Sequence, residues 1–174
     1  MTQSFQWFAL LTRSNFEQIV FDQVTRKKIT AFLPKTRKIS RRRNRKHIIE
    51  VPLFPGYLFV RSSSASAHQL SILKTLGAVR MLGSTHGPTP IPDTQILSLK
   101  IMASAGTDLV TGSCISLKKG DPVMVLEGPM AGLKGEFFQH KGKGRVIIKI
   151  PLLGRYAGVE MDGDNVEKIP ALLS

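Results

Sequence analysis

The sequence predicts an α+β fold in two domains: a front half in which strands and helices alternate, and a back half of short strands. Up to about residue 105, apolar runs suited to strands alternate with segments whose apolar residues recur at helical spacing. Beyond residue 118, short apolar runs alternate with glycine-containing turns, a pattern typical of a small closed β-barrel. The charge divides in the same way, because residues 1–105 carry a net +12 and residues 106–174 only +1.

The chain begins with a predicted buried strand at residues 7–11 and a helix that follows it. Ser14 and Glu17 fit a capping box, in which the serine hydroxyl accepts from the Glu17 amide and the glutamate side chain reaches back. The helix has one apolar face and ends in a cationic run that suits the negative end of its dipole. Its apolar residues are Phe16, Ile19, Val20 and Val24, and its cations are Arg26, Lys27 and Lys28.

Residues 29–33 form a second predicted strand, and residues 36–51 form either an exposed hairpin arm or a disordered basic loop. Next, Pro55 and Gly56 suit the central positions of a type II turn. The strand after it, residues 57–60, is apolar on both faces and must be covered on both, by helices on one side and by more protein or a partner on the other.

A second helix is expected at residues 66–76, with three leucines directed into the core: Leu70, Leu73 and Leu76. A strand at residues 79–82 follows. Asp93 caps a third predicted helix, which carries Ile96, Leu97, Lys100 and Ile101. The expected organisation is a first domain at residues 1–105, a flexible linker at 106–117 and a five-stranded barrel at 118–174.

Composition narrows the function classes. A net charge of +13 and a pI of about 10.3 predict an attraction to polyanions, although a charged surface can also serve only solubility. Cys114 is the single cysteine, so no internal disulfide can form. The sequence shows no signal peptide and no apolar run long enough to span a membrane, so a cytoplasmic protein is expected.

Catalysis is not expected. Only four acidic residues precede residue 106, and no pair of them is spaced for general acid–base chemistry. The four histidines stand apart, and with one cysteine they form no zinc pattern; they are His47, His68, His86 and His140. The sequence also lacks a phosphate-binding GxxxxGK[ST] loop, so we expect no metal and no cofactor.

Two segments, in this order, resemble the NusG family. Residues 52–60, with their Phe-Pro-Gly-Tyr turn, resemble the signature of the NusG N-terminal (NGN) domain. The second segment resembles the KOW motif through Gly120, Asp121, Val123, Gly128, Pro129, Met130, Gly132, Leu133 and Gly135. The resemblance implies an NGN-type α/β sandwich, with an antiparallel sheet flanked by helices, followed by an SH3-like five-stranded KOW barrel.

The resemblance also implies two partners for the first domain. The clamp coiled coil of RNA polymerase would bind an apolar patch whose matching positions are Phe54, Pro55, Tyr57 and Phe59, with Phe8 and Ile39 as further members. Tyr57 and Phe59 could instead be plain core. Non-template or upstream DNA would lie along basic or polar positions, which are Arg13, Arg41, Arg42, Arg43, Arg45, Lys46, His68 and Lys74. Eleven Lys/Arg and no acid between Arg26 and Lys46 support DNA-backbone contact, with a solvated hairpin tip as the alternative.

For the nearly neutral barrel, the family implies a small-subunit ribosomal protein or the termination factor Rho as partner. Met130 and Leu133 are expected to contact it, while the KOW glycines are expected to serve tight turns. One member of the family has a C-terminal domain that switches between a helical hairpin and a barrel. Here the β-branched run at residues 146–148 favours a permanent barrel.

The predicted function is a monomeric elongation and antitermination factor, located at the nucleoid through RNA polymerase. The strongly basic first half favours a specialised, RfaH-like paralogue. A general factor that assists Rho, and a KOW-type ribosome or RNA-binding protein, are the alternatives.

Overall fold

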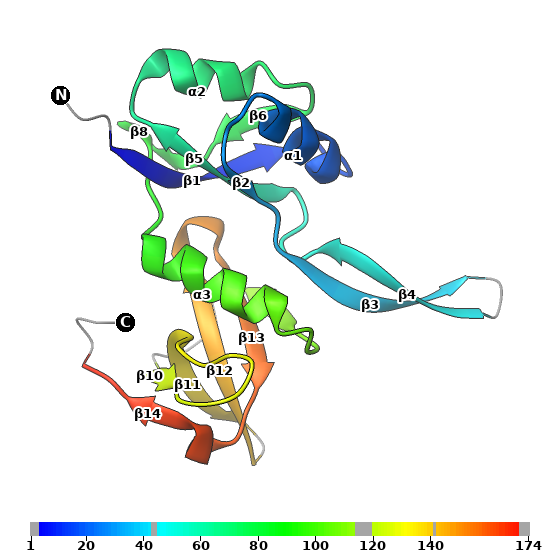
Figure 1. The fold of residues 1–174 in the computed structure, drawn as a ribbon, viewed down its shortest axis with the longest axis vertical. Coiled ribbons are helices and arrows are strands. Elements are labelled where there is room, and N and C mark those ends of the chain that lie inside the picture. Colours follow the sequence, from blue (N-terminus) through cyan, green and yellow to red (C-terminus); the bar gives the residue numbers. More distant parts are fainter. Residues whose placement is uncertain (1–3, 43–44, 114–119, 141, 171–174) are drawn as a thin grey trace. The chain divides into compact units, whose positions relative to one another are not determined.

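The computed structural model describes residues 4–42, 45–113, 120–140 and 142–170, and it has the expected α+β composition (Figure 1). The chain forms two compact units. One, here the N-terminal unit, consists of Met1–Lys35 and Pro52–Asp93; the other, here the C-terminal unit, consists of Thr36–Val51 and Thr94–Ser174.

The N-terminal unit is built on a four-stranded antiparallel sheet in the order β2-β5-β1-β6. Its long central strands are β1 (Phe5–Thr12) and β5 (Tyr57–Ser63), with the edges formed by β2 (Ala31–Phe32) and β6 (Ala78–Met81). Strand β2 therefore occupies only the middle of the strand expected at residues 29–33. A small hairpin of β7 (Gly83–Ser84) and β8 (Gly87–Pro88) follows the sheet.

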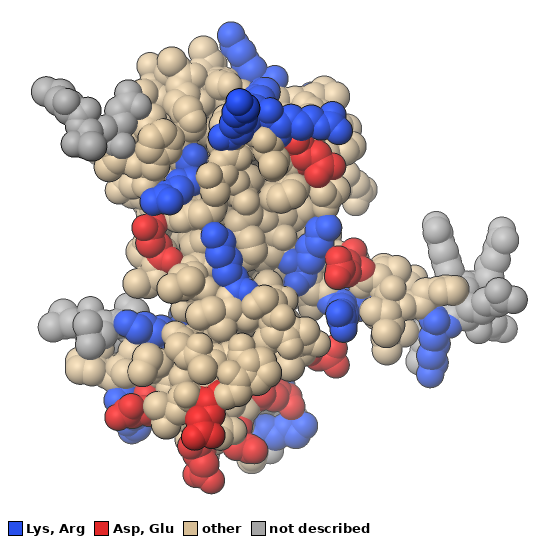
Figure 2. Space-filling view, viewed as in Figure 1, with Lys and Arg blue, Asp and Glu red and all other residues tan. Residues whose placement is uncertain are grey.

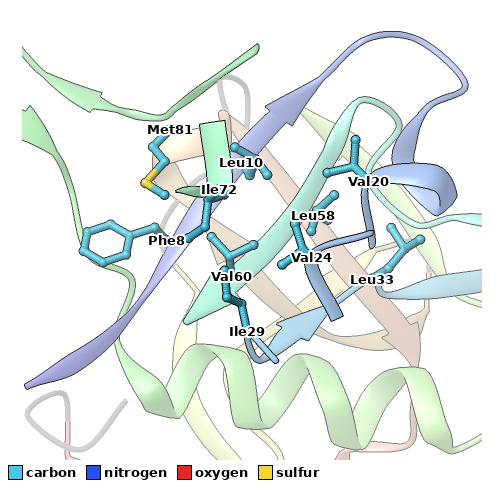
Figure 3. Close-up of a cluster of buried hydrophobic side chains, with 10 residues drawn as sticks. All are labelled: Phe8, Leu10, Val20, Val24, Ile29, Leu33, Leu58, Val60, Ile72 and Met81. Carbon is cyan, nitrogen blue, oxygen red and sulfur yellow. The ribbon is translucent and has the colours of Figure 1, made fainter. Parts of the chain in front are cut away.

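Helices α1 (Glu17–Arg26) and α2 (Ser66–Leu73) cover one face of this sheet. Side chains alternate along the strands, so every second residue of β1 and β5 points at the helices. The resulting core contains Phe8, Leu10, Leu58 and Val60 from the sheet, with Val20, Val24 and Ile72 from the helices (Figure 3). Tyr57 and Phe59 consequently lie on the other face of the sheet, so the prediction that β5 is apolar on both sides is confirmed.

The predicted orientation of α2 is wrong. The helix ends at Leu73, and Leu70, Leu73 and Leu76 are 51%, 36% and 62% exposed. Ile72, which is fully buried, fills the core position instead. Because α2 has apolar residues on both sides, its sequence does not determine which side faces the sheet.

The C-terminal unit contains α3 (Asp93–Ser104), which starts at the boundary between the units, and a two-stranded hairpin of β3 (Lys35–Arg42) and β4 (Arg45–Pro52). Ile96 of α3 is buried as expected, whereas Leu97 is exposed. Residues 43–44 lie outside the described residues, but the two strands agree with the hairpin arm and not with the disordered loop.

The rest of the C-terminal unit is a six-stranded antiparallel sheet in the order β14-β10-β11-β12-β13-β9. Its strands are β9 (Val110–Ser113), β10 (Asp121–Val125), β11 (Lys134–His140), β12 (Lys143–Ile150), β13 (Arg155–Glu160) and β14 (Val166–Lys168). Short 3-10 turns, Pro151–Leu153 and Gly163–Asn165, join the last three in sequence.

Strand β9 is one more than the five strands expected, and it lies inside the segment expected to be a linker. It pairs with β13, from Arg155 opposite Ser113 to Gly158 opposite Val110. Within this unit, helix α3 is bonded to the start of β11, because the Lys134 amide donates to Ser98 Oγ at 3.2 Å. The domain boundaries at residues 105 and 118 stay predictions.

Two of the KOW glycines, Gly135 and Gly128, disfavour a side chain for different reasons. Gly135 lies where β11 approaches β12 closely, and a Cβ atom there would lie 2.7 Å from the Ile147 carbonyl oxygen. Gly128 has a φ of +81° but open space around it. The first position excludes any side chain by contact, whereas the second disfavours one only through backbone conformation.

This difference predicts unequal effects of the same substitution. Gly135→Ala should lower the free energy of unfolding by about 3 kcal/mol, since the backbone of β12 must move. Gly128→Ala should cost about 1 kcal/mol, the penalty of a left-handed residue with a Cβ atom. Urea unfolding followed by circular dichroism measures both, and equal reductions in stability would contradict the packing argument.

Candidate functional site

The Phe-Pro-Gly-Tyr turn joins the loop before β5 to the strand itself. The Tyr57 amide donates to the Phe54 carbonyl at 3.0 Å, and Gly56 has a φ of +85°. A residue at the third position of a type II turn needs a positive φ, so the predicted turn is confirmed. Pro55 is exposed and Tyr57 is half-buried, which makes these two the accessible ring side chains of the turn.

Glu17 stabilises this turn through a hydrogen bond. Its Oε1 atom accepts a hydrogen bond from the Gly56 amide at 2.7 Å, although its side chain is almost completely buried. The Thr12 amide of β1 donates to the Gly56 carbonyl at 2.8 Å, so both polar groups of this glycine are fixed. Since the conformation of the turn sets the direction of Pro55 and Tyr57, Glu17 is a positioning residue for that surface.

The predicted capping box is therefore wrong. Helix α1 begins at Glu17, its N-cap residue is Phe16, and no side chain caps it. The carboxylate expected to reach back to Ser14 instead bonds a residue 39 positions away. The Glu17 carboxylate thus accepts from the Gly56 amide of the turn and does not cap its own helix.

The structure brings part of the predicted apolar patch together in the N-terminal unit. Phe54 and Phe59 are fully buried and pack edge to face, with ring centroids 6.3 Å apart. Phe32 stacks on Phe59 at 6.1 Å. In this structure Phe54 and Phe59 thus support the surface that Pro55 and Tyr57 form, and do not belong to its exposed part.

Phe8 does not share the surface of Pro55 and Tyr57, and Ile39 belongs to the other unit. Phe8 pairs with Val60 in the ladder and enters the core beneath the helices, on the face of the sheet opposite Tyr57. Ile39 lies on β3 of the C-terminal unit and is 68% exposed.

The basic positions that the structure describes are on the surface. Arg13, Lys74 and Lys46 are exposed, Arg13 directly after β1 and Lys74 at the end of α2. Arg43 and the side chains of Arg41, Arg42 and Arg45 lie outside the described residues. Figure 2 shows acidic side chains gathered over the strands of the C-terminal unit, in keeping with the uneven charge of the sequence.

His68 has a more defined environment than its sequence indicates. Its Nδ1 atom lies 2.8 Å from Ser62 Oγ, and that hydroxyl donates to the Ser63 carbonyl. A hydroxyl has one proton, so with that proton donated to the Ser63 carbonyl, His68 Nδ1 is the donor in this pair. Phe5 packs against the imidazole edge to face at 5.4 Å. Hydrogen bonds and packing thus fix the ring.

The KOW segment begins with a small polar cluster. The Gly120 amide and Lys149 Nζ both bond Glu136 Oε2 at 2.8 Å, which ties the start of β10 to β11 and β12. Asp121 pairs with Lys168 at 3.0 Å on the surface. At the other end of β12, the Arg145 guanidinium, with Lys143 beside it, lowers the pKa of the Glu160 carboxyl.

Met130 and Leu133 were expected to contact a partner, but both are buried in the C-terminal unit. The exposed residues of their loop are Leu126, Glu127, Gly128, Pro129, Ala131 and Gly132. A cavity of about 300 Å³ adjoins this loop and is lined by Glu127, Pro129, Val159, Met161 and Asp162, among others. The burial of Met130 and Leu133 makes them part of the core, and the exposed residues of the same loop are better placed for a partner.

Within residues 4–42, 45–113, 120–140 and 142–170, the histidine, cysteine and acidic side chains make no group of three that could hold a metal ion. The helices in the same part of the chain are too short or too polar to cross a membrane.

Comparisons with known proteins agree with one another. Residues 5–100 match the family described as transcription termination factor NusG. The transcription termination/antitermination protein NusG of Thermus thermophilus is 25% identical over 182 residues, which cover 95% of this chain and 99% of that protein. The protein of the same description from Helicobacter pylori strain J99 is 24% identical and covers 94% and 98%. A solved structure of Thermotoga maritima NusG shares the fold, with a TM-score of 0.54, 21% identity and coverage of 96% and 98%.

Removing the carboxylate of Glu17 should loosen the turn. Glu17→Ala leaves the Gly56 amide without this acceptor and should lower the free energy of unfolding by about 2 kcal/mol. Glu17→Gln keeps an acceptor oxygen and should be clearly less destabilised. Trp7, the single tryptophan, lies in the N-terminal unit and reports its unfolding in urea by fluorescence. Wild-type stability in both variants would contradict the anchoring role.

Proposed function

Because the chain belongs to the NusG family, and is therefore a transcription termination/antitermination factor and not an enzyme, we propose that it acts by binding RNA polymerase during elongation. The observation that carries the proposal is the Pro55–Tyr57 surface, formed by a turn that Glu17 and Thr12 hold in place. A preformed turn loses little conformational entropy on binding. The partner we propose for it is the clamp coiled coil of the polymerase.

Within this surface, Tyr57 is the proposed anchor. Its ring is partly accessible, and aromatic anchors contribute strongly to protein interfaces once they are buried by the partner. Phe54 and Phe59 act beneath it, where their edge-to-face packing keeps the surface rigid. Phe8 has no place in this contact because it faces the helices. Ile39, which is exposed on the hairpin, stays a proposed further member.

The basic positions are proposed to contact the nucleic acid of the elongation complex, on the upstream duplex or the non-template strand. Arg13 and Lys74 of the N-terminal unit are exposed, and the sequence between Arg26 and Lys46 concentrates cations without any acidic residue. Contacts of this type position a protein on DNA and are weakened by salt. His68, whose ring is held by Ser62, would add a polar contact.

The charge also favours a specialised paralogue that suppresses pausing and termination over a general factor that assists Rho. A net +12 in residues 1–105 predicts tight engagement with nucleic acid. For the C-terminal unit we propose an adaptor role, with a small-subunit ribosomal protein or Rho as partner. The contact would use the exposed loop with Leu126 and Pro129 and the cavity beside it.

The polymerase contact can be tested on a purified elongation complex, with and without Rho. Wild-type protein should shorten pauses, and Tyr57→Ala should weaken polymerase binding about thirtyfold, the effect of removing one anchor worth about 2 kcal/mol. Tyr156→Ala, at the other tyrosine, is the matched control and should bind normally through the N-terminal unit. Unchanged binding of Tyr57→Ala would reject the proposed contact. If wild-type protein lengthened pauses and aided Rho on every template, the specialised role would be rejected.

The proposed contact of the β3–β4 hairpin with nucleic acid can be tested through the dependence of binding on salt. Replacing Arg41 and Arg43 by glutamine should reduce the dependence of the affinity on salt, by about 0.9 in the slope of log K against log salt for each phosphate that the variant no longer neutralises. Arg155→Gln with Lys168→Gln removes the same charge from the C-terminal unit and should leave the slope unchanged. Equal slopes in all three proteins, measured by titration of the elongation complex, would place the DNA contact elsewhere.

A further inference from the structure

The outer side of α2 and the neighbouring sheet edge form an apolar surface, here called the α2 leucine surface. Its members are Leu70, Leu73, Leu76 and Val79, of which all but Leu73 are at least half exposed. Scattered single leucines are ordinary on protein surfaces. Four large apolar side chains within ten residues are not scattered, and exposed patches of this kind mark interaction sites.

Helix and strand geometry places these side chains together. Leu70 and Leu73 are three residues apart on α2 and share one side of it, while Ile72 points into the core. Val79 lies on β6 where the pairing of that strand with β1 shifts register, and its side chain is 50% exposed. α2 packs against β6, which is an edge strand.

The charges that this stretch of the chain carries have one sign. Lys74 is exposed beside the leucines, and the sequence contains no acidic residue between Ser62 and Pro92. The complementary surface is therefore apolar at its centre and acidic at its rim.

We propose that the α2 leucine surface docks a partner protein through an amphipathic helix with a leucine-type face and acidic flanks. A phosphate backbone fits less well, because it offers nothing to the four apolar side chains. A second copy of this chain would bring cations against cations. A membrane fits less well, since α2 has eight residues and one lysine at its end, far from the cation-rich face of a membrane-binding helix.

This site lies beyond the proposed polymerase contact. Leu58 and Val60 of β5 point toward α1 and α2, whereas Tyr57 and Phe59 point to the other face of the sheet. The α2 leucine surface and the Pro55–Tyr57 surface thus belong to opposite faces of one sheet. Both can be occupied in the same complex.

The probe is a synthetic labelled peptide of about 18 residues, five helical turns, with leucine on one face and glutamate on the other. Fluorescence anisotropy with the full chain should show saturable binding. The double variant Leu73→Ser, Leu76→Ser should weaken it at least about tenfold, because two leucine side chains no longer bury apolar surface against the peptide. Lys74→Glu should weaken it in the same direction.

Three controls make the result specific. Leu97→Ser removes a leucine of similar exposure from α3, and Tyr57→Ala alters the other face of the sheet; both should bind the peptide normally. A peptide of the same composition with its leucines spread around the helix should bind weakly. Thermal melting by circular dichroism verifies that the double variant is folded.

Absent binding, or equal binding by the double variant or by the scrambled peptide, would overturn the proposal. So would two alternative results. One is binding of the wild type, but not of the double variant, to vesicles of anionic phospholipid without any binding of the peptide. The other is a concentration-dependent dimer that the double variant abolishes.

Discussion

The antiparallel ladder between β1 and β5 is the constraint on which the N-terminal unit depends. It runs from Phe5 opposite Ser63 to Leu11 opposite Tyr57, and its register decides which side chains meet the helices. Leu10 and Leu58 go to the core, and Tyr57 goes to the opposite face. A shift of one residue would exchange the two sets, so the core beneath α1 and α2 also determines where the aromatic face of the turn lies.

Features with a local cause could be predicted from the sequence. The Pro55–Gly56 turn follows from the backbone angles of its own two residues, and Val20 and Val24 occupy the core because helical spacing places them on one face. The role of Glu17 has no local cause. Its partner is an amide 39 residues away, while a serine three residues before it offers an ordinary helix cap. Only the tertiary structure decides between the two.

Burial was hardest to predict for helices and loops that carry apolar residues on more than one side. Leu70, Ile72 and Leu73 could each face the sheet, and the sheet admits Ile72. Met130 lies in a loop of KOW type, where a partner contact would require exposure, yet it is buried. Strand β9 is composed of residues that also suit a linker, and its pairing with β13 makes it a strand. In each case the deciding interaction comes from a distant part of the chain.

The polar and apolar surfaces of the N-terminal unit differ in how they respond to solution conditions. Apolar contacts at Tyr57 or at Leu73 depend little on ionic strength, whereas contacts of Arg13 or Lys74 with phosphates weaken as salt rises. Because Tyr57 and Leu73 serve opposite faces of one sheet, a complex that engages both gains from effective concentration without a new contact on either face. Each apolar contact can then be weak by itself. In the complexes proposed above, long-range attraction to nucleic acid would increase the rate of encounter, and the apolar surfaces would determine which protein partners stay bound.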